Sequence, residues 1–153
     1  MNNIRNSAKA IIIKEGKLLC TKNQDSTGLF YLLPGGGQEK GETLKDALKR
    51  ECIEEISAEV EIEDIIFIRE YIGKNHEFSK WDYELHQVEY MFKCSIISEK
   101  NVETGTVPDD MQIGIEWLEL DKLNEYRLYP RALKDLINEK GQFKKIVYLG
   151  DTN

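Results

Sequence analysis

Hydrophobic and polar positions in the first third of the chain predict a hairpin followed by a third, short strand. An apolar run at residues 7–13 is typical of a buried strand, and the polar turn at residues 14–17 lets residues 18–21 return as its partner. The apolar and aromatic residues 29–33 predict another strand. This strand ends at residues 34–37, a proline and three glycines, because neither residue type sustains a regular element.

A change of period after the glycines predicts a helix at residues 43–56. Thr43 is a suitable N-cap, and Asp46, three residues later, forms a variant of the capping box. Farther along, the pattern predicts strands at residues 60–71, 86–97, 113–120 and 145–149, loops at 73–83 and 101–110, and a second helix at 130–139 with Pro130 in its first turn. Strands mixed with two helices indicate an α/β or α+β fold, in which helices cover a mixed sheet.

The first helix changes character along the face that should be buried. Leu44 and Leu48 share one side, because successive residues are rotated by about 100° around the helix axis. One turn later the same side carries Glu51 and Glu55, with Glu54 beside them. An apolar stripe therefore continues as a group of carboxylates.

The spacing of these glutamates makes them repel one another. Glu51 lies three residues before Glu54 and four before Glu55. Like charges at these spacings destabilise a helix by about 0.2–0.5 kcal/mol per pair, and partial burial increases that cost. A divalent cation that prefers oxygen ligands, Mg²⁺ or Mn²⁺, would offset the repulsion. A solvated acidic face is the alternative, and the helix alone leaves both interpretations open.

Neighbouring residues bear on this choice. Ile53 and Ile56 lie on a different side from the leucines, which indicates a helix packed between two layers. Arg50 lies four residues before Glu54 and can hold that carboxylate in place, with an ordinary surface ion pair as the alternative. The glycines at residues 35–37 let backbone groups approach a metal ion or a phosphate, with a plain turn as the alternative.

Length, composition and charge narrow the class of protein. The 153 residues, 41% hydrophobic and 32% charged, predict one globular domain spanning residues 1–153. The net charge of −7 argues against nucleic-acid binding, which needs a basic face, but an acidic protein can act on phosphates through a bound cation. The sequence has no membrane-spanning run and no secretion signal. Cys20, Cys52 and Cys94 lack metal-ligand spacing and predict reduced thiols in a cytoplasmic protein.

Residues 36–58 together resemble the signature of the Nudix hydrolase superfamily (MutT-like), G-x5-E-x7-R-E-U-x-E-E-x-G-U, in which U is a bulky aliphatic residue. The matching polar and glycine positions are Gly36, Glu42, Arg50, Glu51, Glu54 and Glu55. The chain departs from the signature at Ser57, where the family has glycine, and at Ala58, where a larger residue is usual. Because that glycine normally ends the helix with a positive φ, Ser57 leaves the end of the helix open.

The resemblance implies a fold, a reaction and a set of roles. It implies an α/β/α sandwich around a central mixed β-sheet, and Mg²⁺- or Mn²⁺-dependent cleavage of a diphosphate linkage in a nucleoside diphosphate derivative. It makes Glu51, Glu54 and Glu55 metal ligands and, with Arg50, catalytic residues; the Gly36 backbone is a further ligand, and Gly41 and Glu42 are structural. A catalytically silent nucleotide-binding or regulatory domain on the same fold is the alternative. The predicted partner is a small phosphorylated molecule, and a homodimer stays open.

Outside the signature, the loop at residues 73–83 is the predicted substrate wall. Phe78 and Trp81 are candidates for stacking on a base, and Lys74 and Lys80 for binding phosphate. Phe30 and Tyr31 could also stack on a base, but the favoured interpretation places them in the core or half-core of a strand. The resemblance also implies an additional acidic base from a loop, for which the candidates are Glu89, Asp109, Asp110 and Glu116; surface roles are the alternative for each. His86 is interpreted as a satisfied core histidine.

Overall fold

The computed structural model describes residues 3–97 and 102–153. The elements in chain order are β1 (Arg5–Lys14), β2 (Lys17–Asp25), β3 (Gly28–Leu32), β4 (Gly35–Gly37), α1 (Leu44–Ile56), β5 (Val60–Ile72), the 3-10 helix η1 (Gly73–Asn75), α2 (Ser79–Asp82), β6 (His86–Ile96), β7 (Gln112–Glu119), the 3-10 helix η2 (Leu120–Glu125), β8 (Leu128–Tyr129), α3 (Leu133–Leu136) and β9 (Tyr148–Asp151).

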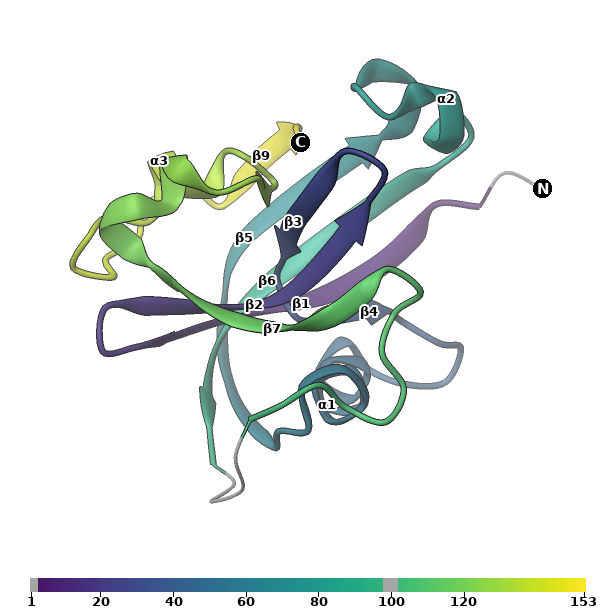
Figure 1. Ribbon diagram of the computed structural model, residues 1–153. Helices are drawn as coiled ribbons and strands as arrows, with labels where there is room; N and C mark the ends of the chain where they lie inside the picture. Colours follow the sequence, from purple (N-terminus) through teal and green to yellow (C-terminus); the bar gives the residue numbers. More distant parts are fainter. Residues whose placement is uncertain (1–2, 98–101) are drawn as a thin grey trace.

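The strands form one strongly curled mixed sheet (Figure 1). Its main path runs β8-β3-β2-β1-β6-β5-β9, while β4 pairs with β1 and β7 pairs with β2. The pairs β1–β6, β3–β8 and β5–β9 are parallel, and the others are antiparallel. The central strand β1 therefore connects both halves of the sheet, and the predicted mixed sheet is confirmed.

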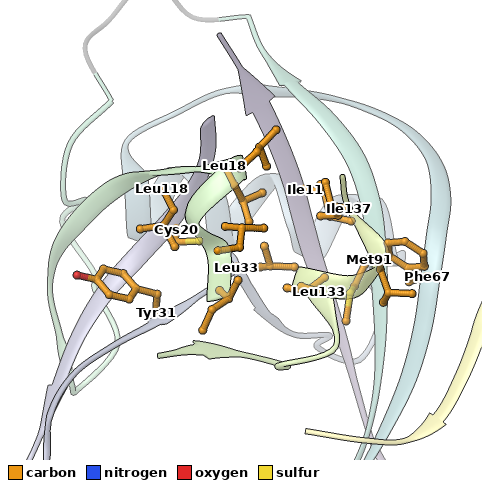
Figure 2. Close-up of a cluster of buried hydrophobic side chains, with 14 residues drawn as sticks. Ile11, Leu18, Cys20, Tyr31, Leu33, Phe67, Met91, Leu118, Leu133 and Ile137 are labelled. Atoms are coloured by element: carbon orange, nitrogen blue, oxygen red, sulfur yellow. The ribbon is translucent and has the colours of Figure 1, made fainter. Parts of the chain in front are cut away.

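Side chains that alternate along β1 serve the two faces of the sheet. Ala8, Ala10 and Ile12 pack in a buried cluster with α1, whereas Ile11 belongs to a second cluster with η2 and α3. Figure 2 shows this second cluster, in which side chains of the strands meet those of the α3 region. The sheet is thus covered by the long helix α1 on one face and by short helical turns on the other (Figure 1).

The helix α1 begins as its sequence predicts. The Thr43 side chain accepts a hydrogen bond from the Asp46 N–H, and the Asp46 carboxylate accepts one from the Thr43 N–H, so the capping box is confirmed. The helix ends at Ile56, followed by Ser57 in the left-handed conformation with φ 54°. Serine therefore adopts the backbone geometry that usually favours glycine. Ile53 is 51% exposed, so the prediction that α1 packs between two layers is wrong.

The second predicted helix, residues 130–139, is much shorter in the structure. Only Leu133–Leu136 is helical, and Ile137 is already extended, bridging to Phe143. The Asn138 side chain accepts hydrogen bonds from the N–H groups of Lys140 and Gln142, so a side-chain turn replaces further helical bonds.

Other predicted boundaries shift by a few residues. The loop at residues 73–83 contains η1 and α2, and the last strand begins at Tyr148 rather than at residue 145. Residues 102–110 form no regular element, and position 101 lies outside the described residues. None of the helices in residues 3–97 and 102–153 combines the length and hydropathy needed to cross a membrane.

Candidate functional site

A cavity of about 690 Å³ opens where β1, β4, α1 and the loop around α2 meet the tip of the β2–β3 hairpin. One part of its wall contains the glycines of β4 and Glu51 of α1. Another part contains Asp25, Phe30, Phe78, Arg127 and Tyr129. The fold therefore brings the signature helix and the loop at residues 73–83, which are distant in sequence, to the same cavity.

Arg50 connects the glycine strand, the preceding loop and the helix. Its guanidinium donates to Glu42 Oε1 at 2.7 Å, to Glu51 Oε1 at 2.9 Å, to Glu54 Oε2 at 3.3 Å and to the Gly37 carbonyl at 3.1 Å. The pairing with Arg50 holds the pKa of Glu42 below its usual value. Arg50 thus lies at the centre of a group of carboxylates.

The strand β4, which consists of three glycines, lies very close to β1 and to the Glu51 side chain of α1. A Cβ at Gly36 would lie 2.6 Å from the Glu51 carboxylate. A Cβ at Gly35, which has φ 135°, would lie 2.1 Å from the Ala8 carbonyl oxygen. Glycine is therefore required at position 35, where a Cβ would meet backbone, whereas at position 36 a Cβ would displace the end of the Glu51 side chain.

Glu55 is the most unusual ionisable group of the helix. It is 2% exposed, and its Oε1 atom has no hydrogen-bond partner among residues 3–97 and 102–153. Burial raises the pKa of Glu55 to about 8; the positive charge of Lys9 acts in the opposite direction, while the charges of Asp109 and Glu51 raise the pKa further. A buried acceptor without a partner is unfavourable, which indicates that this position serves something other than stability.

The carboxylates of α1 do not converge in the arrangement described. Within residues 3–97 and 102–153, no three acidic, histidine or cysteine side chains form a group that would hold a metal ion. Glu51 and Glu54 pair with Arg50, whereas Glu55 is buried. The donor set nevertheless fits a divalent cation, since carboxylate oxygens are preferred ligands of Mg²⁺ and Mn²⁺ and the buried oxygen of Glu55 lacks a partner.

The segment at residues 103–107 is hydrogen-bonded to the C-terminal end of α1. The N–H groups of Gly105 and Val107 donate to the carbonyl oxygens of Glu55 and Glu54 at 2.9 and 3.1 Å. A Cβ at Gly105 would lie 2.0 Å from the Glu54 carbonyl oxygen, so the contact needs glycine. This attachment brings the following Asp109 to the cavity wall, close enough for its charge to act on Glu55.

The four candidate bases occupy different environments. Asp109 lines the cavity and has no ion pair within the described residues. Glu89 also lines the cavity but is buried and bonded to Arg69 at 2.8 Å. Burial favours its neutral form, but the charges of Arg69 and Lys9 together with the hydrogen bonds from Arg69 and Gln87 outweigh this and hold the pKa of Glu89 below its usual value. Asp110 and Glu116 are not part of the cavity wall. Asp109 and Glu89 are therefore the two candidates that the structure brings to the site.

Of the four predicted substrate residues, two line the cavity and two do not. Phe78 and Trp81 line the cavity, and Trp81 is 73% exposed. Lys74 and Lys80 are exposed and lie outside the cavity wall, with the Lys80 ammonium 5.4 Å from the centre of the Trp81 ring. The structure thus places the aromatic residues of this loop at the cavity and leaves its lysines outside.

The structure separates the neighbouring aromatic residues Phe30 and Tyr31, and it adds two basic residues to the cavity wall that the sequence did not single out. Phe30 lines the cavity, whereas Tyr31 is buried in the core. Alternation along the strand was the available signal, because adjacent residues point to opposite faces. Arg5 and Lys9 of β1 also reach the cavity, although the sequence surrounding them is that of a buried strand. His86 is half-buried and paired with Glu70 at 2.9 Å, so its side chain is satisfied but does not lie in the core.

Comparisons with known proteins agree with this arrangement. The model of the family described as NUDIX domain matches residues 4–138. The nucleoside triphosphatase NudI of Salmonella typhimurium is 28% identical over 138 residues, which cover 83% of this chain and 94% of that protein.

Solved structures show the same fold. A NUDIX hydrolase from Nitrosomonas europaea has a TM-score of 0.70 at 19% identity and covers 97% of this chain and 80% of its own. An ADP-ribose pyrophosphatase from Streptococcus suis has a TM-score of 0.64 at 19% identity and covers 97% and 100%, respectively. The expected sandwich around a mixed sheet is confirmed, with short helical turns forming its second outer layer.

Proposed function

Since the chain belongs to the NUDIX domain family and is a Nudix-type pyrophosphohydrolase, we propose that it cleaves a diphosphate linkage in a nucleoside diphosphate derivative with the aid of Mg²⁺ or Mn²⁺. One observation carries this proposal: Glu55 is buried with an oxygen that has no partner within the described residues, and Glu51 of the same helix lines a cavity of about 690 Å³. Cavities of roughly 300–1,000 Å³ accommodate ligands of nucleotide size.

Glu51, Glu54 and Glu55 are the proposed ligands of the cation, with the Gly36 carbonyl as a further oxygen donor. When bound, the cation neutralises charge on the diphosphate and lowers the pKa of a bound water. Arg50 holds Glu51 and Glu54 in reach of the site and would be their partner whenever the cation is absent. The proposed role of Arg50 is therefore to keep two acidic ligands from repelling each other and leaving the cavity.

The chain supplies the remaining groups from two other segments. Arg5 and Lys9 lie on the cavity face of β1 and present positive charge to the phosphates. Arg5 has no ion pair within the described residues, so its guanidinium is available. Asp109 is the proposed proton acceptor, because Glu89 is already engaged with Arg69. Phe78 and Trp81 are the proposed contacts of the nucleoside.

The names of similar proteins suggest where to begin the search for the substrate. One relative is called a nucleoside triphosphatase, and one solved structure is called an ADP-ribose pyrophosphatase. Both reactions break a phosphoric anhydride bond of a nucleotide. Nucleoside triphosphates and ADP-ribose therefore lead the substrate panel, followed by nucleotide sugars and dinucleoside polyphosphates.

The test is release of phosphate, diphosphate or nucleoside monophosphate from this panel, measured with Mg²⁺, with Mn²⁺ and in EDTA. We expect turnover of at least one substrate with either cation and none in EDTA. Glu61→Gln, a change at an exposed position on β5, is the matched control for changes in the signature helix. Nucleotide binding without turnover of any substrate would instead support a catalytically silent binding domain and contradict the proposal.

A further inference from the structure

The cavity wall formed by β3, β8 and the loop before α2 is a cluster of flat groups. The rings of Phe30 and Phe78 lie edge-on to Tyr129, with centroids 6.3 and 5.5 Å from its ring. The guanidinium carbon of Arg127 lies 5.2 Å from the centre of Phe30, 5.9 Å from Phe78 and 5.6 Å from Tyr129. All four residues line the cavity.

Arg127 is held rigidly in this cluster. Its Nη1 and Nη2 atoms each donate to one oxygen of Asp25 at 2.9 Å, and its Nε donates to the Tyr129 hydroxyl at 2.9 Å. Asp25 is fixed in turn by the N–H and hydroxyl of Thr27. The orientation of the guanidinium is therefore set by the tip of the β2–β3 hairpin rather than by solvent.

The charge of this cluster distinguishes it from a phosphate site. Asp25 pairs with both terminal nitrogens of Arg127, so the cluster carries little net positive charge, and its carboxylate would repel a phosphate. Free positive charge lies elsewhere on the wall, at Arg5. Flat aromatic and guanidinium surfaces without a free charge favour the stacking of a planar, uncharged ring.

We propose that Phe30, Phe78 and Arg127 form a subsite that stacks on the nucleobase of a nucleoside polyphosphate, and that Asp25 is a positioning residue that fixes Arg127. This inference rests on the proposed function, because it identifies the part of the substrate that the aromatic wall binds. The phosphates would then lie toward Arg5, Lys9 and Glu51, on the remaining wall of the same cavity.

The experiment compares two probes that differ in the base. Binding of ATP and of inorganic tripolyphosphate is measured by calorimetry in EDTA, for wild type and for Phe30→Ala, Phe78→Ala and Arg127→Lys. We expect each change to weaken ATP binding by about tenfold, the effect of losing one stacking partner, while tripolyphosphate binding stays within about twofold. Arg127→Lys keeps the positive charge but removes the flat guanidinium and its paired hydrogen bonds to Asp25.

The proposed role of Asp25 is tested by a kinetic measurement that a merely structural role would not change. Asp25→Asn should raise KM for the best nucleotide about tenfold with little change in kcat, and Asp25→Glu should restore part of the loss. Tyr83→Ala is the control for the aromatic changes, because Tyr83 is 61% exposed on the same loop and does not line the cavity. Glu119→Gln is the control for Asp25, since Glu119 pairs with Lys122 at 2.9 Å outside the cavity.

The outcomes separate this inference from the proposed function. If the variants, shown by melting to be folded, lose affinity for tripolyphosphate as much as for ATP, the cluster binds phosphate and the inference is wrong. If ATP is hydrolysed and its KM and affinity are unchanged in all variants, the inference fails while the proposed function stands. If ATP binds through these residues and no panel substrate is hydrolysed, the base subsite stands and the proposed function fails.

Discussion

Glu55 is the residue on which the proposed chemistry depends most directly. Glu55→Gln keeps the size of the side chain and removes its capacity to carry negative charge. Because the variant loses a proposed metal ligand, we expect kcat to fall at least about a hundredfold at saturating Mg²⁺. Steady-state kinetics on the best panel substrate measure this effect. Near-normal kcat in Glu55→Gln, with Glu61→Gln also normal, would remove Glu55 from the mechanism.

Asp25 supplies a prediction about acid stability. The hydrogen bonds from Arg127, with those from Thr27, hold the pKa of Asp25 below its usual value, so the folded state keeps this carboxylate ionised at pH values where the unfolded state binds a proton. Its stabilising contribution is therefore complete above the unfolded pKa, about 3.9, and is lost as the pH falls through the lower folded pKa.

We accordingly expect wild type to lose more stability than Asp25→Asn between about pH 5 and pH 2. Urea denaturation at a series of pH values measures the difference in stability, which should shrink steadily as the pH falls toward 2. Parallel curves for the two proteins across this range would show that the Asp25–Arg127 pair contributes nothing to stability.

At the scale of elements, the end of α1 and the segment at residues 103–107 act as one unit. Gly105→Val would place a side chain against the Glu54 carbonyl oxygen, which a Cβ would approach to 2.0 Å. Overpacking of this kind typically costs about 1–3 kcal/mol of folding free energy. We also expect kcat to fall, because Asp109 follows this segment into the cavity.

The chain offers a matched control for this substitution. At Gly114 of β7 the nearest atom to a Cβ would be 4.0 Å away, so Gly114→Ala should leave stability and kcat almost unchanged. Denaturation curves and initial rates for both variants test the prediction. Equal behaviour of Gly105→Val and Gly114→Ala would mean that the attachment of residues 103–107 to α1 contributes neither stability nor activity.

Among the elements, local signals predicted α1 well and the region after β8 poorly. The capping box and the apolar face of α1 are properties of neighbouring residues, so they can be read from the sequence. After Pro130 the periodic pattern is equally helical, but Asn138 closes a side-chain turn and Phe143 bridges to Ile137. The competing contacts come from residues beyond the predicted helix, which a local pattern does not include.

For the whole molecule, metal binding should raise the thermal stability. A ligand that binds only the folded state stabilises it by about 2.7 kcal/mol at a hundred times its Kd, which raises Tm by roughly 5–10 °C for a protein of this size. We expect Mg²⁺ or Mn²⁺ to raise the Tm of wild type and to raise that of Glu55→Gln less. NaCl at equal ionic strength should have a smaller effect on both proteins, because it only screens charge.

The same melts address the effect of burying Glu55. Its raised pKa means that ionisation opposes folding, and this destabilisation grows as the pH rises from about 4 toward 8. In EDTA at neutral pH, Glu55→Gln should therefore be at least as stable as wild type. Equal shifts of wild type by Mg²⁺ and by matched NaCl would identify the glutamates as a solvated face and remove the physical basis of the metal site.

The structure also bears on the predictions about the cysteines and the number of domains. Cys20, Cys52 and Cys94 are free and buried, in agreement with the predicted reduced thiols. One domain over residues 1–153 is supported by the sheet, which includes both β1 and β9, and it stays a proposal. A cytoplasmic location and a homodimer remain predictions from the sequence.

The sequence by itself determined the family, the signature helix and the identity of its acidic residues. These features depend on residues within about twenty positions of one another, so spacing alone reveals them. It also separated the aromatic residues of the loop at residues 73–83 as candidates for substrate contact, and the structure places Phe78 and Trp81 at the cavity.

Only the tertiary structure decided how the site is assembled. Asp25, Phe30 and Arg127 come from segments up to 102 residues apart, and β3 pairing with β8 brings them together. Burial of Glu55, engagement of Glu89 by Arg69 and delivery of Asp109 by the end of α1 likewise result from packing between distant elements. Such contacts follow from the complete arrangement of the sheet, because no local pattern fixes which residues face one another across a cavity.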